Sequence, residues 1–130
     1  MQADERPFYA LLGLEVVSAE DGQSLVSLPA SPSLANSRGN VHGGAIATLL
    51  DAALAAATRS RLAPGAGATT ITLTTAYLAP ASGPLTASGR LIRLGRSIAT
   101  VEATAKDESG TPVAHALGTF RIIKRRDGAV

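Results

Sequence analysis

The alternation of apolar and polar residues divides the chain into strand-like segments and one long helical segment. Residues 14–20 and 23–30 alternate with a period of two on either side of Asp21-Gly22, which predicts a β-hairpin. Four later segments are rich in Thr, Val and Ile and are separated by short turn sequences, so each predicts a strand: residues 69–80, 84–94, 97–107 and 111–124. Residues 42–61 instead predict one helix.

The predicted helix is apolar on nearly every side, so it needs cover on nearly every side. The connections between strands are short, which favours antiparallel pairing between strands that are neighbours in the chain. The simplest arrangement is an α+β fold, in which an antiparallel sheet of about six strands wraps around one long central helix. A helix face that the sheet leaves open would need a second subunit. Residues 7–12 predict a short helix that Gly13 ends, and residues 30–40 predict a loop.

The composition fits a single domain over residues 1–130 and limits its chemistry. There is no cysteine, which excludes disulfides and thiolate metal sites. We identify no leader sequence and no membrane-length apolar run, so we expect a cytoplasmic protein without a membrane partner. The net charge is +2, and two Tyr, two Phe and no Trp leave few stacking surfaces, so no nucleic-acid partner is expected. Residues 125–130 are expected to fray.

One acidic residue, Asp51, stands in the middle of the apolar helix. It is the only acid between Asp21 and Glu102, and helix propensity gives no reason for an Asp at this position. A charge there costs free energy unless it is paired or hydrogen-bonded. Two interpretations follow. Asp51 lies partly exposed on a helix edge and pairs with Arg59, Arg61 or another cation, or it serves as a base or nucleophile in a reaction site.

The predicted start of the helix, His42-Gly43-Gly44, is suited to bind an oxyanion. The first backbone amides of a helix have no partner inside it and favour negative charge, and glycines let a ligand approach closely. Such amides stabilise the oxyanion that forms when a carbonyl is attacked. Asp51 follows His42 by roughly 12 Å of helix, so the two cannot act on one atom within one chain. A symmetric dimer would bring Asp51 of one subunit to the helix start of the other.

Other chemistries lack their motifs. The chain has no GxSxG elbow, and residues 39–44 lack the GK[ST] of a phosphate-binding loop. His42 and His115 are too few and too isolated to predict zinc, so no metal site is expected. His42 alone is also compatible with a capping or loop histidine, and His115 with a packed or surface histidine.

The residues around the predicted helix resemble those of hotdog-fold acyl-CoA thioesterases. The shared positions are Asn36, His42, Gly43, Gly44 and Asp51, spaced as N-x5-HGG-x6-D, and then Tyr77, Leu78 and Pro80. The most similar type is the PaaI-like, phenylacetate-degradation branch of the 4-hydroxybenzoyl-CoA thioesterase superfamily. A sister branch that acts on 1,4-dihydroxy-2-naphthoyl-CoA usually carries Glu in place of this Asp. The resemblance implies hydrolysis of an aryl- or medium-chain acyl-CoA thioester to a free acid and CoA.

The resemblance implies a catalytic role for each of five residues. Asp51 would attack the thioester carbonyl or activate water, and the backbone N–H of Gly43 would polarise that carbonyl. Asn36 would orient the water or the thioester. His42 would support the loop and hydrogen-bond near the carbonyl or Asn36, and Thr70 would help to place the water.

The resemblance also implies a substrate surface and an oligomer. The residues expected to contact the substrate or its CoA are Gly44, Leu54, Thr58, Tyr77, Arg90, Arg93 and Arg96. The three arginines are candidates for the CoA phosphates, because Arg–phosphate contacts are strong and charge-assisted. The family forms each site across a homodimer, and a dimer of dimers is common. No metal and no bound cofactor are implied, because CoA belongs to the substrate.

Two other functions remain open, because hotdog folds host several activities. One is an enoyl-CoA hydratase or dehydratase that uses His42 and Asp51. The other is a non-catalytic acyl-CoA-binding module. A thioesterase releases free thiol, a hydratase changes enoyl absorbance without releasing thiol, and a binding module does neither.

Overall fold

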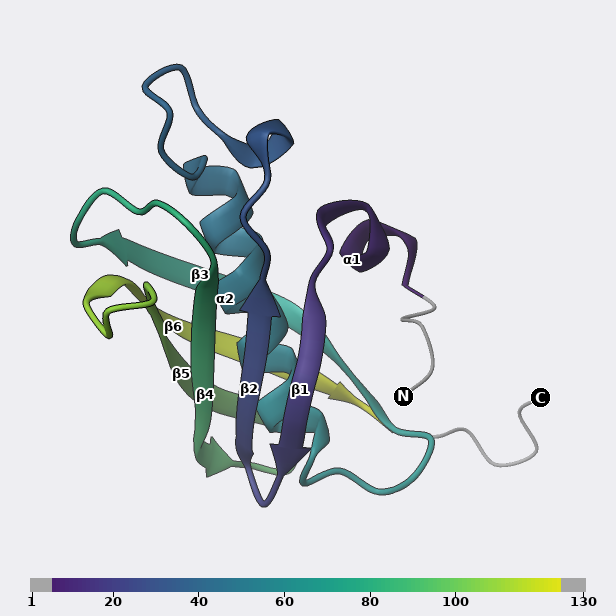
Figure 1. Ribbon diagram of the computed structural model, residues 1–130. Coiled ribbons are helices and arrows are strands. Elements are labelled where there is room, and N and C mark those ends of the chain that lie inside the picture. Colours follow the sequence, from purple (N-terminus) through teal and green to yellow (C-terminus); the bar gives the residue numbers. More distant parts are fainter. Residues whose placement is uncertain (1–5, 125–130) are drawn as a thin grey trace.

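In the computed structural model, which describes residues 6–124, a six-stranded sheet curves around one long helix (Figure 1). The strands are β1 (Glu15–Glu20), β2 (Gln23–Leu28), β3 (Gly67–Tyr77), β4 (Leu85–Leu94), β5 (Ile98–Lys106) and β6 (Pro112–Ile123). The helices are α1 (Pro7–Leu12) and α2 (Gly43–Arg59), and a single 3-10 turn lies at Pro32–Leu34. The predicted α+β arrangement is therefore confirmed. The expectation about residues 125–130 lies outside the described residues.

The strand order is β1-β2-β4-β5-β6-β3, and every neighbouring pair is antiparallel. Pairing between strands that are consecutive in the chain is confirmed for β1–β2, β4–β5 and β5–β6. It is wrong for β3 and β4, because β3 pairs with β6 and β4 pairs with β2. Residues 78–84 connect β3 to β4. A chain of this length spans up to about 24 Å, more than the roughly 14 Å between strands three places apart, so it does not force a hairpin.

Helix α2 packs against the concave face of the sheet through small and branched side chains. Its buried residues are Ala45, Ile46, Leu49, Leu50, Ala52, Ala53, Leu54, Ala55, Ala56, Ala57 and Thr58. The approach is closest at Gly89 of β4, where an added Cβ would lie 2.4 Å from the carbonyl oxygen of Ala53. The same oxygen accepts a hydrogen bond of 2.7 Å from the buried Ser24 hydroxyl. Glycine at position 89 thus allows the helix to lie directly on the sheet.

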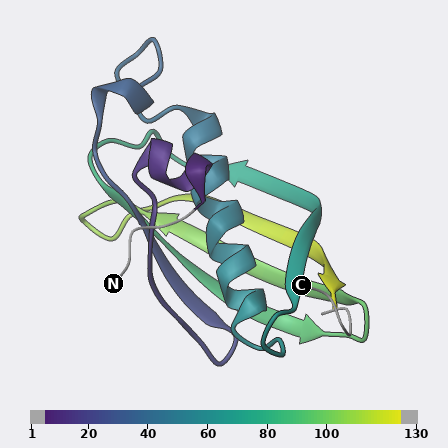
Figure 2. The ribbon, with the colours of Figure 1, turned by 90° about the vertical axis from the view of Figure 1, so that its right-hand side faces the viewer.

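Helix α1 lies beside α2 on a side that the sheet does not cover (Figure 2). It begins at Pro7 and ends at Gly13, whose φ of 78° lies in the left-handed region that favours glycine. None of its residues is buried, and Phe8 and Leu11 are 56% and 78% exposed. Neither α1 nor α2, the two α-helices of the described residues, is long and apolar enough to cross a membrane.

Strand β3 forms one edge of the sheet and β1 forms the other. β3 has 11 residues and pairs only with β6 within the chain. Most of its side chains are exposed, including Ile71 at 52%. A long edge strand carries unpaired backbone groups that favour pairing with another strand.

Candidate active site

The lone acid of α2 lies on the one face of the helix that the sheet leaves open. Ala47 and Thr48 lie three and four residues after Gly44, and Asp51 lies four and three residues after them, so the four residues share a face. Each of the four is exposed or half-buried, whereas every α2 residue from 52 to 58 is buried. We call these four residues the open helix face. Figure 2 places α1 next to this half of the helix.

The carboxylate of Asp51 is hydrogen-bonded to strand β3. The hydroxyl of Thr70 donates to Oδ1 of Asp51 over 2.8 Å. Thr70 pairs across the sheet with Phe120, whose side chain is buried, so both point to the concave side. Neither Arg59 nor Arg61 forms an ion pair with Asp51. The interpretation of Asp51 as the partner of one of these arginines is therefore not the arrangement found.

His42 caps the start of α2 and leaves one backbone amide free. Its Nδ1 accepts a hydrogen bond of 2.8 Å from the N–H of Gly44, so the neutral ring carries its proton on Nε2. The N–H groups of Ala45 and Ile46 donate to the carbonyl oxygen of His42, over 3.0 and 3.1 Å. Of the first four backbone amides of α2, those of residues 43–46, only that of Gly43 has no hydrogen-bond acceptor within residues 6–124. It is the group available to a ligand at the helix start.

The loop before α2 is closed by Asn36. Its Oδ1 accepts hydrogen bonds from the backbone N–H groups of Arg38 and Asn40, over 2.9 and 3.0 Å. Its own backbone N–H donates to the carbonyl of Asn40 over 2.7 Å. Because the side-chain oxygen is used by the loop, the side-chain NH2 is the group left to face a ligand.

Asn36, Gly43 and Tyr77 line one open cavity of about 460 Å³ at the helix start, which we call the Asn36 cavity. The hydroxyl of Tyr77 donates to the carbonyl of Gly43 over 2.7 Å and ties the end of β3 to the helix. Arg38 and Asn40 also line this cavity. The structure thus brings together the predicted residues Asn36, Gly43 and Tyr77.

The Asn36 cavity and Asp51 do not meet within one chain. Asp51 follows Gly43 by eight residues of continuous helix, which is a rise of about 12 Å. The predicted site residues therefore form two groups. One is Asp51 with Thr70, and the other lies at the helix start.

Two predicted substrate contacts are inside the protein core. Leu54 and Thr58 are both 0% exposed. The hydroxyl of Thr58 donates to the carbonyl of Leu54 over 2.9 Å, inside the helix. In this structure they pack between helix and sheet and line no cavity described for residues 6–124.

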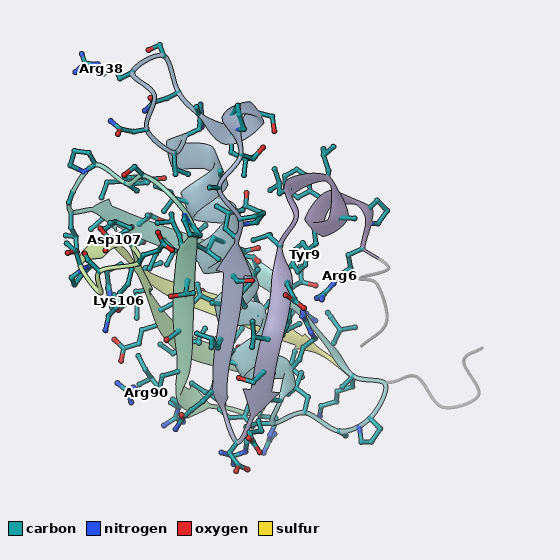
Figure 3. All side chains as sticks on the ribbon, viewed as in Figure 1. Arg6, Tyr9, Arg38, Arg90, Lys106 and Asp107 are labelled. Carbon is teal, nitrogen blue, oxygen red and sulfur yellow. The ribbon has the colours of Figure 1, made fainter. Side chains whose placement is uncertain are left out.

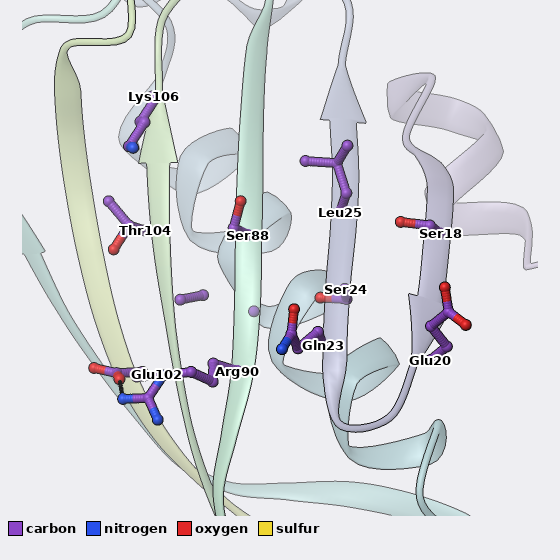
Figure 4. Close-up of a pocket in the computed structure, with 12 residues that line it drawn as sticks. Ser18, Glu20, Gln23, Ser24, Leu25, Ser88, Arg90, Glu102, Thr104 and Lys106 are labelled. Atoms are coloured by element: carbon purple, nitrogen blue, oxygen red, sulfur yellow. Dashed lines mark hydrogen bonds and ion pairs between the residues drawn. The ribbon is translucent and has the colours of Figure 1, made fainter.

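The predicted phosphate-binding arginines lie away from the helix start of their own chain. Arg90 is on the convex face of the sheet and forms an ion pair with Glu102, inside a cavity of about 610 Å³ (Figure 4). Arg93 lies near the end of β4, and Arg96 follows Gly95 in the turn before β5, as expected. Figure 3 places Arg38 at the tip of the loop before α2 and Arg90 near the opposite end of the molecule.

The second histidine also lies on the convex face. Nε2 of His115 is 3.6 Å from Oε1 of Glu102, and its Nδ1 is 3.0 Å from the hydroxyl of Thr104. The description of His115 as a packed or surface histidine is confirmed, since it is half-buried. Nowhere in residues 6–124 do three His, Asp or Glu side chains gather so that they could hold a metal ion.

The residues of α1 that lie near the open helix face were not predicted from the sequence as site residues. Burial raises the pKa of Tyr9, while the neighbouring charges of Arg6 and Arg59 lower it and that of Asp51 raises it. The Arg6 guanidinium lies 4.1 Å from the centre of the Tyr9 ring. The apolar segment at residues 7–12 was the only signal in the sequence, and nothing in it indicates the helix against which α1 lies.

Comparison with known proteins identifies the family. The model of the thioesterase superfamily matches residues 38–114. The chain is 35% identical to VNG_1336C of Halobacterium salinarum, provisionally named an esterase, over 93% of this chain and 87% of that one. It superposes on BH2602 of Bacillus halodurans, solved with CoA, with a TM-score of 0.84 and 32% identity over 92% of this chain and 80% of that one.

The fold is also that of the PaaI protein from the phenylacetic acid degradation operon of Escherichia coli. The TM-score is 0.86, with 24% identity over 93% of this chain and 87% of the PaaI chain. The resemblance drawn from the sequence is thereby confirmed. The chain belongs to the thioesterase superfamily and is a thioester hydrolase with the hotdog fold.

Proposed function

We propose that the protein hydrolyses an aryl- or medium-chain acyl-CoA thioester to the free acid and CoA, with Asp51 as the reacting carboxylate. The observation that carries the proposal is the Asp51 carboxylate on the open helix face, held at one oxygen by Thr70. No described residue donates to its second oxygen, which leaves that atom free to act. The unpartnered amide of Gly43 supports the other half of the proposal, because it can receive the charge that develops on a carbonyl oxygen.

The proposed site lies between two copies of the chain. The two groups of residues are about 12 Å apart in one copy, too far to act on one carbonyl. In a two-fold dimer, Asp51 and Thr70 of one copy would face Asn36 and Gly43 of the other. The open edge of β3 favours this assembly, since Thr70 and Tyr77 both lie on β3 and two such edges can pair. A dimer of such dimers is the expected complete assembly.

The proposed chemistry needs only groups of the protein and water. In one route, Oδ2 of Asp51 removes a proton from water while the water oxygen attacks the thioester carbon. In the other, Oδ2 attacks that carbon itself, and water then hydrolyses the resulting anhydride. In both routes the carbonyl oxygen gains charge beside Gly43 N–H, the C–S bond breaks, and the thiolate takes up a proton. Thiolates leave readily, so no strong leaving-group acid is required.

CoA is proposed as part of the substrate, and no metal or resident cofactor is needed. The CoA-containing relative BH2602 supports this assignment. The candidates for binding the CoA phosphates remain Arg90, Arg93 and Arg96. Because they lie away from the helix start of their own copy, they would contact CoA bound at the helix start of the partner copy. Asn36 and His42 are proposed to orient the thioester or the water at the helix start.

The test is release of free thiol from phenylacetyl-CoA, a hydroxybenzoyl-CoA, hexanoyl-CoA and palmitoyl-CoA. We expect wild type to hydrolyse at least one ester and Asp51→Asn to lower kcat by a hundredfold or more, which corresponds to about 3 kcal/mol of barrier. The proposal is supported if Asp51→Asn shows this loss of kcat while its melting temperature stays that of wild type. If Asp51→Asn releases thiol as fast as wild type, the proposed role of Asp51 is overturned. A wild type that binds CoA esters without releasing thiol would favour a binding module.

A further inference from the structure

A second cavity lies on the other side of the helix start, between α1 and the open helix face. Its volume is about 210 Å³. The residues that line it are Phe8, Leu12, Ser33, Leu34, Ala35, His42, Gly44, Ala45 and Thr48. We call it the α1 cavity. It shares no lining residue with the Asn36 cavity. Gly43 lines the Asn36 cavity, and its neighbours in the chain, His42 and Gly44, line the α1 cavity.

The linings of these two cavities differ in chemistry. Besides apolar residues such as Val41, Ile46 and Leu78, the Asn36 cavity is lined by the polar residues Asn36 and Asn40 and by the charged residue Arg38. The α1 cavity has no Asp, Glu, Lys or Arg in its lining, and its bulkiest side chains are apolar. A thioester has the same asymmetry, with a polar pantetheine chain on the sulfur side of the carbonyl and an apolar group on the other side. A carbonyl at Gly43 would therefore direct its apolar group toward the α1 cavity.

The α1 cavity borders the open helix face, which carries Asp51 of the same copy. Gly44 and Thr48 line it, and both belong to the open helix face together with Asp51. Asp51 follows Thr48 by three residues, a rise of about 4.5 Å. A group that enters from the helix start thus follows a face of α2 that is not closed by the sheet.

We propose that the α1 cavity receives the acyl group of the substrate, and that Phe8 and Leu12 of α1 determine which acyl groups are accepted. This inference rests on the proposed thioesterase function and adds its substrate class. The volume of about 210 Å³ is below the usual range for drug-sized ligands, so the cavity suits a compact aryl or short acyl group better than a long chain. Phe8, at 56% exposed, has an uncovered aromatic surface with which an aryl group can pack.

Helix α1 offers a matched control for this proposal. Leu11 lies on the same helix, is also a large apolar residue and is 78% exposed, but it does not line the α1 cavity. Leu11→Ala removes the same side-chain atoms from α1 as Leu12→Ala does. Only truncation of Leu12 or Phe8 enlarges the proposed acyl site.

The experiment compares kcat/KM for phenylacetyl-CoA, hexanoyl-CoA and palmitoyl-CoA in wild type, Phe8→Ala, Leu12→Ala and Leu11→Ala. We expect Phe8→Ala and Leu12→Ala to lower the ratio of phenylacetyl-CoA to palmitoyl-CoA activity at least tenfold, mainly through KM. Leu11→Ala is expected to leave this ratio within twofold of wild type. Equal losses for all three esters, or the same ratio in Phe8→Ala and Leu11→Ala, would overturn the proposal. Either result would mean that α1 only stabilises the fold or contacts a second copy of the chain.

A binding measurement separates this proposal from the proposed function. The probe is a non-hydrolysable ketone analogue of phenylacetyl-CoA, with CoA itself as the comparison, in calorimetric titrations. We expect Phe8→Ala to weaken binding of the analogue at least tenfold and binding of CoA less than twofold. If Asp51→Asn retains wild-type activity but Phe8 discriminates between the two ligands, the mechanism fails and the acyl site stands. If Asp51 is required but Phe8→Ala binds both ligands like wild type, the acyl site fails.

Discussion

At the scale of single residues, the contact that distinguishes Asp51 from an ordinary surface acid is the hydroxyl of Thr70. The bond of 2.8 Å fixes one carboxylate oxygen, and no described residue donates to the other. A hydrogen bond to a charged group contributes roughly 1.5–3 kcal/mol. The reactivity proposed for Asp51 thus depends on a neighbour 19 residues away in the chain.

Thr70→Val keeps the β-branched shape and removes the donor. We expect kcat for the best ester to fall by about 10- to 100-fold, which is the loss that a bond of this kind predicts. Steady-state thiol release measures the effect, and circular dichroism verifies the fold. In an Asp51→Asn background the second substitution should add little, because both remove the same interaction.

Thr72→Val is the matched control on the same strand. The hydroxyl of Thr72 is 2.7 Å from that of Thr119 and does not contact Asp51. Its kcat should stay within threefold of wild type. Equal losses in the Thr70 and Thr72 variants would contradict a specific role for Thr70.

At the scale of secondary-structure elements, α2 both fills the core and carries the reaction site. Small residues let it lie directly on the sheet, as at Gly89, and this leaves only one face open.

The sheet around it is held by strand pairing and by turns such as that between β5 and β6. In this turn, Oδ1 of Asp107 accepts bonds from the N–H groups of Ser109 and Thr111, over 2.9 and 3.0 Å, and one of 2.7 Å from the Ser109 hydroxyl.

These hydrogen bonds, that of the Ser109 hydroxyl first, hold the pKa of Asp107 below its ordinary value of 3.8. A carboxyl whose pKa is lower in the folded state stabilises the fold above its unfolded pKa, and this contribution is lost as the pH falls through the folded value. We therefore expect Asp107→Ala to lower Tm at pH 7 and to leave Tm unchanged at a pH well below 3.8. Thermal unfolding between pH 7 and pH 2 measures this difference.

Glu108→Ala is the control for this turn, since no described hydrogen bond or ion pair uses Glu108. Its Tm difference from wild type should not follow the same pH profile. A Tm deficit of Asp107→Ala that persists unchanged in acid would contradict the proposed role of the ionised carboxylate.

At the scale of the whole molecule, the separation of about 12 Å along α2 makes the proposed site a property of two copies. Each site would take Asp51 and Thr70 from one copy and the Asn36 loop from the other. The order of strands permits this, because β3 lies at an edge and leaves its residues accessible to a partner.

Mixing two inactive variants tests this arrangement. In a mixed dimer of Asp51→Asn and Asn36→Ala, one site would carry both substitutions and the other would carry neither. Random mixing should therefore restore about a quarter of wild-type activity. Thiol release after joint refolding and subunit exchange measures the recovery.

The control is a mixture of Asp51→Asn with Thr70→Val. Both substitutions affect the same half of a site, so no mixed dimer has an intact site and the rate should not exceed the average of the two variants. Recovery in this mixture, or none in the first, would contradict a site shared between copies in this way.

The sequence by itself determined the secondary-structure elements and the two groups proposed to react with the substrate, the Gly43 amide and the Asp51 carboxylate. Periodicity and turn residues predicted all six strands and both helices, because these signals depend on near neighbours in the chain. The placement of Gly43 and Asp51 on one helix, too far apart to cooperate, also followed from the sequence, since helical rise is fixed.

Only the tertiary structure decided which elements meet. The pairing of β3 with β6 rather than β4 follows from long-range packing, and no local pattern encodes it. The same packing places Thr70 against Asp51, buries Leu54 and Thr58, and turns Arg90 to the convex face. It also sets Phe8 and Leu12 beside α2, because a face left open by the sheet is covered by whichever apolar segment the fold brings near.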